Sequence, residues 1–261
     1  SSGTSAIVSV GTTGESATLS QAENVEVVGK TIEYVNGRIP VIAGTGANST
    51  AEAIEMTLAA AKLGADASLQ VVPYYNKPEQ AGMYAHFKLI AETVSVPHIL
   101  YNVPGRTVVD MSNETTLRLA EIDNIVGIKD ASGNVARGAQ LIADAPDDFS
   151  VYSGDDATAL ELIMAGAKGD VSVTANVAPA MMSAMVAAAL NDDIEAAKAY
   201  NLDLMGLHTG LFVEASPAPC KWALHQMGKL DNVLRLPLLP LSRDGEDVVA
   251  QAMSQAGIEY K

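Results

Sequence analysis

Lys129 is the residue of this sequence best placed for covalent chemistry. It directly follows the apolar run Ile125–Ile128, a pattern typical of a buried strand, so its side chain is expected at the mouth of a sheet with apolar walls. Such surroundings lower the pKa of an amine, and an uncharged lysine attacks carbonyl carbons to form Schiff bases. The alternative interpretation is a structural lysine in an ion pair, for example with Asp130.

Tyr101 and Arg106 lie in the motif HILYNVPGRT, which belongs to the preceding repeat of the chain. Tyr101 ends a predicted strand, so in a parallel sheet its phenol is expected near Lys129, where a hydroxyl can relay protons during imine formation. Pro104 and Gly105 turn the chain so that Arg106 reaches the rim, and its fork of donors suits a carboxylate. A buried hydroxyl bonded to the backbone and a rim salt bridge are the alternatives for the two residues.

The turn GTTGES at residues 11–16 follows another predicted strand and combines two glycines, three hydroxyls and a carboxylate. A turn of this kind presents backbone N–H groups to an anion, and the hydroxyls of Thr12 and Thr13 can join a proton relay. A phosphate-binding loop would continue with a lysine, which is absent here. The expected anion is therefore a carboxylate.

Tyr74 and Tyr75 place two adjacent phenols after Pro73, at the end of a third predicted strand. Adjacent residues at a strand end point in different directions, so one phenol is expected to face the site and the other a partner chain. Tyrosine at an oligomer interface is the simpler explanation.

Seven short apolar runs rich in β-branched residues predict the strands that position these side chains. The mean spacing of about 27 residues fits one strand and one helix per repeat, and the lack of polar alternation is typical of a parallel sheet buried on both faces. Helices are expected between the runs, as over residues 50–63 and 78–94. The runs begin at residues 6, 40, 68, 97, 124, 149 and 169.

The sequence therefore predicts an α/β fold. Polar or glycine-containing segments follow nearly every run, and no GxGxxG fingerprint follows the first one, which favours a (β/α)8 barrel over an open doubly wound sheet. From about Asn191 the pattern is helical only, with helix starts at residues 191–193 and 216–217. We expect the barrel units over residues 1–190 and a helical region, packed on the barrel, over residues 191–261.

Charge and composition exclude several classes of protein. Sixteen Lys plus Arg against 31 Asp plus Glu give a net charge of -15, which disfavours nucleic acid and anionic membranes as partners. Cys220 is the only cysteine, so no intrachain disulfide forms, and a reducing cytoplasm fits. The four histidines lie far apart, with no spacing typical of a metal site. The first residues lack the basic and long apolar regions of a signal peptide.

Seven motifs, in order, carry a resemblance to a known family. The chain closely resembles the 4-hydroxy-tetrahydrodipicolinate synthases, also called dihydrodipicolinate synthases, from Ser2 to about Ile258. Membership implies a class I aldolase on a (β/α)8 barrel with a C-terminal helical domain, usually tetrameric. It also implies that the enzyme condenses pyruvate with aspartate 4-semialdehyde in diaminopimelate and lysine biosynthesis, without a metal or organic cofactor. The motifs are GTTGES, GTGANST, PYYNKP, YNVPGRT, GIKDASG, YSGDD and SVTAN.

The resemblance also implies a role for single residues. Lys129 matches the Schiff-base lysine, and Tyr101, Thr12 and Tyr75 match proton-relay hydroxyls, Tyr75 being the phenol inserted into the site of a neighbouring subunit. Thr13 and Val171 match pyruvate contacts, and Arg106 matches the residue that receives the carboxylate of the semialdehyde. The positions of the family's lysine feedback site are Ser16, Ala17, Asn48, Glu52 and Tyr74.

The sequence departs from the family at two places. Gln21 and Asn24 stand where the enterobacterial pattern has histidines, which argues against inhibition by lysine. The first strand and helix of the family's barrel have no counterpart, so we expect seven units in place of eight, through a shortened gene product, a trimmed sequence or a gap closed by a partner. The alternatives to the synthase are another pyruvate-dependent aldolase, such as an N-acetylneuraminate lyase, and a binding-only paralogue.

Overall fold

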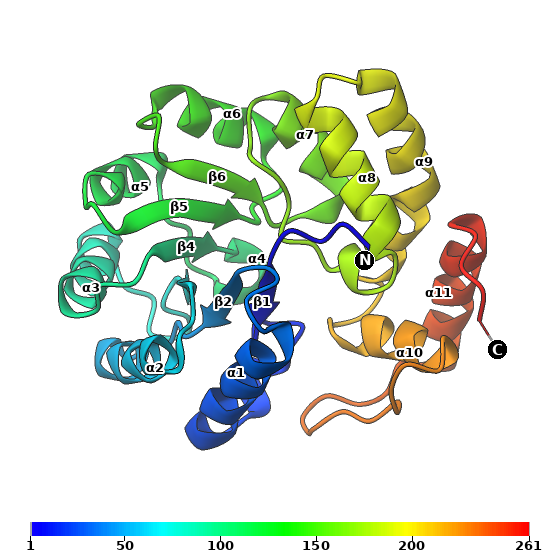
Figure 1. Ribbon diagram of the computed structural model, residues 1–261, viewed down its shortest axis with the longest axis horizontal. Helices are drawn as coiled ribbons and strands as arrows, with labels where there is room; N and C mark the ends of the chain where they lie inside the picture. Colours follow the sequence, from blue (N-terminus) through cyan, green and yellow to red (C-terminus); the bar gives the residue numbers. More distant parts are fainter. Residues whose placement is uncertain (1, 261) are drawn as a thin grey trace. The chain divides into compact units, whose positions relative to one another are not determined.

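A parallel sheet forms the centre of the computed structural model, which describes residues 2–260. Its strands follow one another in sequence order, and every neighbouring pair is parallel. This arrangement, shown in Figure 1, confirms the predicted α/β class. The strands are β1 (Ile7–Ser9), β2 (Val41–Gly44), β3 (Ala67–Val71), β4 (His98–Asn102), β5 (Ile125–Asp130) and β6 (Ser150–Ser153).

A helix follows each strand, and the helices cover the outer face of the curved sheet (Figure 1). Polar caps start several of them: Ser20 and Glu23 form a reciprocal capping box, and Ser49 and Ser112 each accept the backbone N–H group three residues further along the chain. The helices are α1 (Gln21–Val35), α2 (Thr50–Leu63), α3 (Gln80–Thr93), α4 (Pro104–Thr107), α5 (Asn113–Ala120), α6 (Val135–Asp144), η2 (Asp156–Thr158) and α7 (Ala159–Met164).

The predicted helix over residues 50–63 is confirmed as α2, and the one predicted over 78–94 is the slightly shorter α3. Successive strand residues point to opposite faces of the sheet. Leu100 and Ile128 belong to the cluster that packs on the helices, whereas Tyr101 belongs to a separate cluster on the inner face. Lys129 follows Ile128 and therefore points to the inner face.

The seventh predicted strand, from Gly169, is wrong in its extent. Among residues 2–260 this segment makes only a single parallel bridge, between Ser153 and Asp170. The backbone leaves the extended conformation at Val173, and the short helix η3 (Thr174–Asn176) begins there. Six strands are thus formed in the described part of the chain, with β1 and β6 at the two edges, and seven β/α units are not found.

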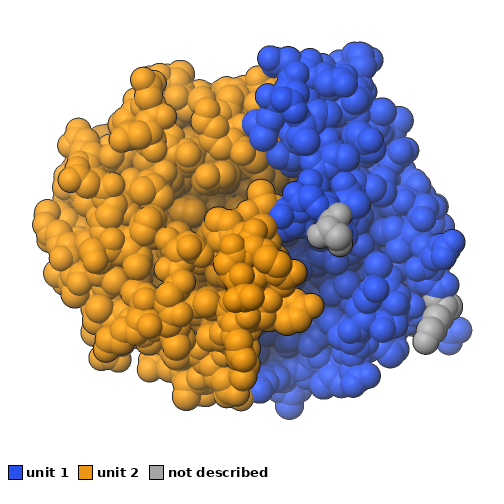
Figure 2. Space-filling model, in the orientation of Figure 1, with its two compact units in different colours: residues 1–4, 12–18, 172–261 blue, residues 5–11, 19–171 orange. Residues whose placement is uncertain are grey.

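The chain divides into two compact units, coloured in Figure 2. One comprises residues 5–11 and 19–171 and contains the sheet; the other comprises residues 1–4, 12–18 and 172–261. The predicted boundary at residue 190, between the strand-and-helix repeats and the helices that follow them, stays a prediction.

The second unit is helical, as predicted beyond residue 191. Asp193 caps α9 through its side chain, and Pro217 precedes α10, so both predicted helix starts are confirmed. Its core is built from Met185, Leu204, Leu207, Trp222 and Met253, among others. Its elements are η1 (Ser16–Thr18), η3, α8 (Pro179–Leu190), α9 (Ile194–Gly210), α10 (Ala218–Gln226) and α11 (Arg243–Gln255).

Candidate active site

Lys129 and Tyr101 are direct neighbours on adjacent strands. Tyr101 of β4 pairs in register with Lys129 of β5, which in turn pairs with Tyr152 of β6, so the three side chains leave the same face of the sheet. The ammonium nitrogen of Lys129 lies 4.4 Å from the centre of the Tyr101 ring. The predicted proximity of phenol and amine is therefore confirmed, and Tyr152 is an aromatic neighbour that the sequence did not reveal.

The ion-pair interpretation of Lys129 is wrong for the described residues. No carboxylate of residues 2–260 lies within ion-pair distance of its ammonium. Asp130 is buried, and its Oδ1 accepts the backbone N–H of Ser132 at 2.9 Å. Because Asp130 is the next strand residue, it points to the opposite face of the sheet, and Lys129 is left available for a ligand.

Gly154 packs against the stem of Lys129. A Cβ atom at this position would lie 2.6 Å from Cε and 2.8 Å from Cγ of Lys129, and 2.9 Å from Cβ of Ala131. These distances are shorter than carbon atoms tolerate, so only glycine leaves the lysine its place. The signal for this residue was present in the motif YSGDD, as a glycine directly after a strand, but the sequence did not show what it contacts.

Arg106 lies in the short helix α4, just beyond the end of β4. Its side chain is exposed, and its guanidinium makes no hydrogen bond or ion pair with any residue between 2 and 260. The predicted rim salt bridge is therefore not formed within the described chain. A free, exposed guanidinium on a fixed loop is suited to binding a carboxylate.

Tyr74, Asn48 and Glu52 are brought together after β2 and β3. The amide of Asn48 donates to the carbonyl oxygen of Tyr74 at 3.1 Å, and the carbonyl of Asn48 accepts the amide of Asn76 at 2.8 Å. Burial and the charge of Glu52 raise the pKa of the Tyr74 phenol, partly offset by a hydrogen bond with the backbone of Asn48. Three of the five residues matched to a feedback site thus form one cluster.

Tyr75 is the most exposed residue of this loop segment to which a role was assigned. Its side chain is 91% exposed, and its backbone adopts the left-handed conformation with φ of 72°. That conformation is unfavourable for a residue with a Cβ atom, so the loop imposes it on Tyr75. Tyr74 is 41% exposed, so the two adjacent phenols differ in exposure, and the predicted division between the site and a partner chain stays a prediction.

Thr12 and Thr13 lie in the turn that belongs to the helical unit, where they are half-buried. The turn closes with a hydrogen bond from the N–H of Glu15 to the carbonyl oxygen of Thr12, at 3.0 Å. Lys221 of α10 holds the Glu15 carboxylate in an ion pair of 2.7 Å, with both side chains mostly buried. Ser16 and Ala17 follow in η1.

Val171 is half-buried, and its N–H donates to the carbonyl oxygen of Ser153 at 2.9 Å, which holds it beside the end of β6. The neighbouring Asp170 has both carboxylate oxygens buried, although the residue as a whole is only half-buried. Burial and the charge of Asp156 raise the pKa of Asp170 well above its usual range, while the charge of Lys129 acts in the opposite direction. Asp170 is a buried acid that sequence reasoning missed.

Residues 2–260 contain no group of three or more His, Cys, Asp or Glu side chains placed to hold a metal ion. None of the helices in that part of the chain is both long and apolar enough to cross a membrane.

Fold and site together define an α/β enzyme with a lysine at the carboxyl end of a parallel strand. Comparison with known proteins makes the assignment specific. Residues 1–256 match the Dihydrodipicolinate synthetase family, and the chain belongs to that family.

Two curated relatives show how close the similarity is. The 4-hydroxy-tetrahydrodipicolinate synthase of Stutzerimonas stutzeri is 59% identical over 256 residues, which are 98% of this chain and 88% of the relative. The synthase of Nitrosomonas eutropha is 58% identical, with the same coverage.

Solved structures agree with the sequence comparison. The chloride-inhibited dihydrodipicolinate synthase of Acinetobacter baumannii, complexed with pyruvate, superposes with a TM-score of 0.97 at 56% identity, covering 99% of this chain and 89% of that one. The enzyme of Aquifex aeolicus gives a TM-score of 0.97 at 41% identity, covering 100% and 89%.

Proposed function

We propose that this chain condenses pyruvate with L-aspartate 4-semialdehyde to give 4-hydroxy-tetrahydrodipicolinate, through a Schiff base on Lys129. The observation that carries the proposal is the unpaired Lys129 ammonium, 4.4 Å from the ring of Tyr101 on the adjacent strand. Relatives 59% and 58% identical bear the name of this synthase, and a similar solved enzyme is complexed with pyruvate.

The chemistry follows from the residues. The amine of Lys129 attacks the ketone carbon of pyruvate, and water leaves to give a protonated imine. The imine makes the methyl group acidic; loss of a proton gives an enamine, whose carbon attacks the aldehyde of the second substrate. The amine of that substrate then closes the ring and displaces Lys129. Hydroxyl groups that relay protons through these steps are those of Tyr101, Thr12 and Tyr75.

Binding roles complete the proposal. Thr13 and Val171 hold pyruvate, and the free guanidinium of Arg106 receives the carboxylate of the semialdehyde. Ser16, Ala17, Asn48, Glu52 and Tyr74 occupy the feedback positions, of which the contacts among Asn48, Glu52 and Tyr74 support a common cluster. The chemistry requires neither a metal nor an organic cofactor.

We further propose that the six strands and the bridged segment at Asp170 correspond to seven units of a (β/α)8 barrel, supported by TM-scores of 0.97 with two family structures. A homo-oligomer, dimer or tetramer, in which Tyr75 enters the site of a neighbouring copy is supported by its 91% exposure. A cytoplasmic location is supported by the cysteine content, because the single cysteine, Cys220, cannot form a disulfide within the chain.

Trapping with borohydride tests the proposal. Incubation of the folded protein with pyruvate and borohydride should reduce the imine and add one pyruvate-derived group to Lys129, located by peptide mass mapping. Lys129→Ala should abolish the adduct. Lys168→Ala is the matched control, because Lys168 is exposed and lies outside the site, and it should react like the unchanged protein. A folded protein that gives no adduct, or an adduct on another lysine, would refute the proposal.

A further inference from the structure

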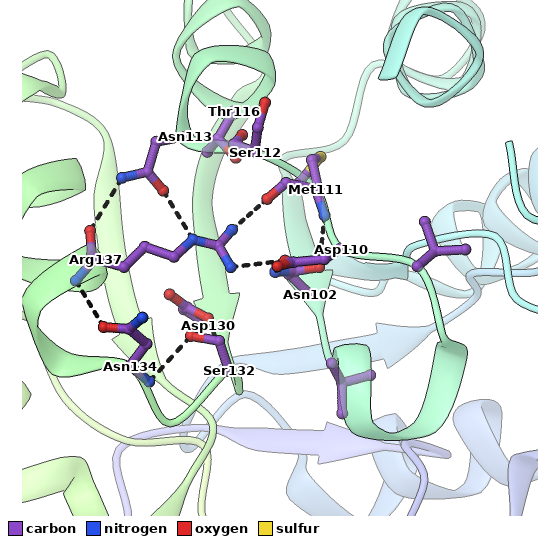
Figure 3. A network of polar contacts seen from close by, with 12 residues as sticks. Asn102, Asp110, Met111, Ser112, Asn113, Thr116, Asp130, Ser132, Asn134 and Arg137 are labelled. Carbon is purple, nitrogen blue, oxygen red and sulfur yellow. Dashed lines mark hydrogen bonds and ion pairs between the residues drawn. The ribbon is translucent and has the colours of Figure 1, made fainter. Parts of the chain in front are cut away.

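Arg137 holds the far end of the loop that carries Arg106, as Figure 3 shows, and Gln80 of α3 binds the same end at Asp110 and Ser112. Nη1 of Arg137 donates to Oδ1 of Asp110 at 2.6 Å, and Nη2 donates to the carbonyl oxygen of Met111. Nε donates to Oδ1 of Asn113 at 3.2 Å. All three nitrogen atoms of the guanidinium are thus directed at residues 110–113, where the loop enters α5.

Arg137 is itself held in place on α6, the helix that follows the Lys129 strand. Its backbone N–H donates to the cap residue Asn134 at 3.1 Å, and its carbonyl oxygen accepts the amide of Asn113 at 3.0 Å. Its side chain is only 18% exposed. Because β5 leads into α6 through only a few residues, the guanidinium ties the loop to the element that positions Lys129.

The same end of the loop is also tied to the Tyr101 strand. Asn102, which directly follows Tyr101, donates from its amide to Oδ1 of Asp110 at 2.8 Å and accepts the N–H of Met111 at 3.1 Å. Asp110 therefore joins Asn102 of β4 and Arg137 of α6 through the same oxygen atom. Asn102 is fully buried, which protects these bonds from competing water.

Between Arg106 and these ties, the loop is held by hydrogen bonds within itself. The hydroxyl of Thr107, the residue after Arg106, is buried and lies 3.1 Å from the carbonyl oxygen of Val103 and 2.9 Å from that of Val109. A displacement of residues 110–111 is therefore transmitted to α4 and to Arg106. Nothing else in residues 2–260 holds the Arg106 guanidinium, so its position depends on the backbone that carries it.

We propose that Arg137, acting through Asp110, is a positioning residue that sets the specificity of the site for the carboxylate of its second substrate. The inference rests on the proposed function, since it assigns the Arg106 loop to the semialdehyde. Arg137 touches no reacting atom in this scheme. It fixes where Arg106 stands relative to Lys129, and the precision of that placement decides how well the acceptor carboxylate is bound.

Kinetics of position 137 test the inference. Arg137→Lys keeps the charge but loses the forked geometry, and Arg137→Met keeps neither. We expect KM for the semialdehyde to rise by about tenfold in Arg137→Met and by less in Arg137→Lys, while KM for pyruvate and the yield of the borohydride adduct stay within about twofold. Arg118→Lys and Arg118→Met on α5 are matched controls, because Arg118 lies over the Tyr84 ring, outside this network.

A second variant guards against a folding defect. Asp110 is 55% exposed, so Asp110→Asn should fold, and it should raise KM for the semialdehyde in the same way. Combining it with Arg137→Lys should add less than the sum of the two single effects, because the two side chains act as one unit.

Hydrogen exchange separates this inference from the proposed function. Amide exchange over residues 103–112 should quicken in Arg137→Met and stay unchanged in Arg118→Met, whether or not the protein forms a pyruvate adduct. Missing adduct in the unchanged protein would refute the proposed function alone. Unaltered exchange and unaltered KM for the semialdehyde in folded variants would overturn the inference. An equal loss of pyruvate and semialdehyde binding would overturn it too, since it would indicate general loosening.

Discussion

Lys129 owes its place to the absence of a side chain on a neighbouring strand end. Gly154 follows β6 and contacts the aliphatic stem of the lysine. A Cβ atom added at Gly154 would lie 2.6 Å from Cε and 2.8 Å from Cγ of Lys129. Two of the atoms that would have to move belong to the flexible Lys129 side chain, so the amine would be displaced, whereas the Cβ of Ala131, 2.9 Å away, is fixed to its backbone.

Gly154→Ala should therefore displace the amine of Lys129 and impair the chemistry. We expect the rate of adduct formation with pyruvate and borohydride to fall by about tenfold or more, because a displacement of about 1 Å costs roughly a hundredfold in well-aligned reactions. Gly29→Ala is the control, since its Cβ would meet only Leu63 at an ordinary 3.5 Å. Normal adduct formation in a folded Gly154→Ala protein would contradict this prediction, because it would show that the stem of Lys129 can accommodate a methyl group at position 154.

The sequence predicted the residues whose type and position indicate a chemical role. It did not predict the residues whose role depends on which side chains they contact in the fold. Lys129, Tyr101 and Arg106 were predicted because each follows a recognisable strand or turn. Gly154 and Arg137 were not, because their partners lie about 25 residues away in sequence, one β/α repeat distant. The distance between repeats in space depends on strand register, which a single sequence does not reveal.

At the scale of elements, a buried histidine joins α2 to α3. Nδ1 of His86 lies 2.9 Å from the hydroxyl of Thr50, the ring packs edge-on against Phe87, and the side chain is 6% exposed. Burial lowers the pKa of His86 from 6.5 to about 4. Between pH 6.5 and pH 4, His86 is therefore protonated in the unfolded chain and neutral in the folded protein.

The sign of the resulting pH dependence follows directly. Above pH 6.5 neither state carries the proton, and as the pH falls from 6.5 toward 4 only the unfolded state gains it, so stability falls. The loss should reach about 2 kcal/mol between pH 7.5 and pH 5. Urea unfolding at both pH values measures it. His86→Gln should remove this part of the slope, and exposed His225→Gln should not. An unchanged slope in His86→Gln would contradict the prediction.

The strands and helices were predictable from periodicity, with one instructive exception. Apolar runs marked six strands because their residues are buried or half-buried on both faces of the sheet. The run from Gly169 has the same composition, yet it turns into η3 after one bridge. An apolar composition indicates that a segment is buried. A strand forms only where the backbone of a neighbouring strand is also available for pairing.

At the scale of the whole molecule, an exposed tyrosine predicts association. Tyr75 is 91% exposed in an unfavourable backbone conformation, and a ring held out into water gains most by insertion into a partner. Native mass measurement should find more than one copy per particle. Tyr75→Ala should weaken association, so that its oligomer falls apart at protein concentrations at which the unchanged protein is still associated. Its turnover should also be slower.

Tyr34→Ala controls for the loss of an exposed ring. Tyr34 lies on α1, is 81% exposed and stacks only with Arg38 of the same segment, so its removal should leave the native mass unchanged. A fully active single chain, or an equal effect of the two variants, would count against the prediction. The net charge of -15 also means that association should strengthen with added salt, which screens the repulsion between copies.

The in-register row Tyr101, Lys129 and Tyr152 restricts how this enzyme can change over evolution. A strand alternates its side chains with a period of two, so deleting or inserting one residue within 125–130 would turn Lys129 toward the helices and bring an apolar or acidic neighbour to the inner face. Substitutions along the strand preserve the count, and length changes do not. Gains and losses of residues should therefore be confined to the loops and helices, while the strand lengths stay constant among active members of the lineage.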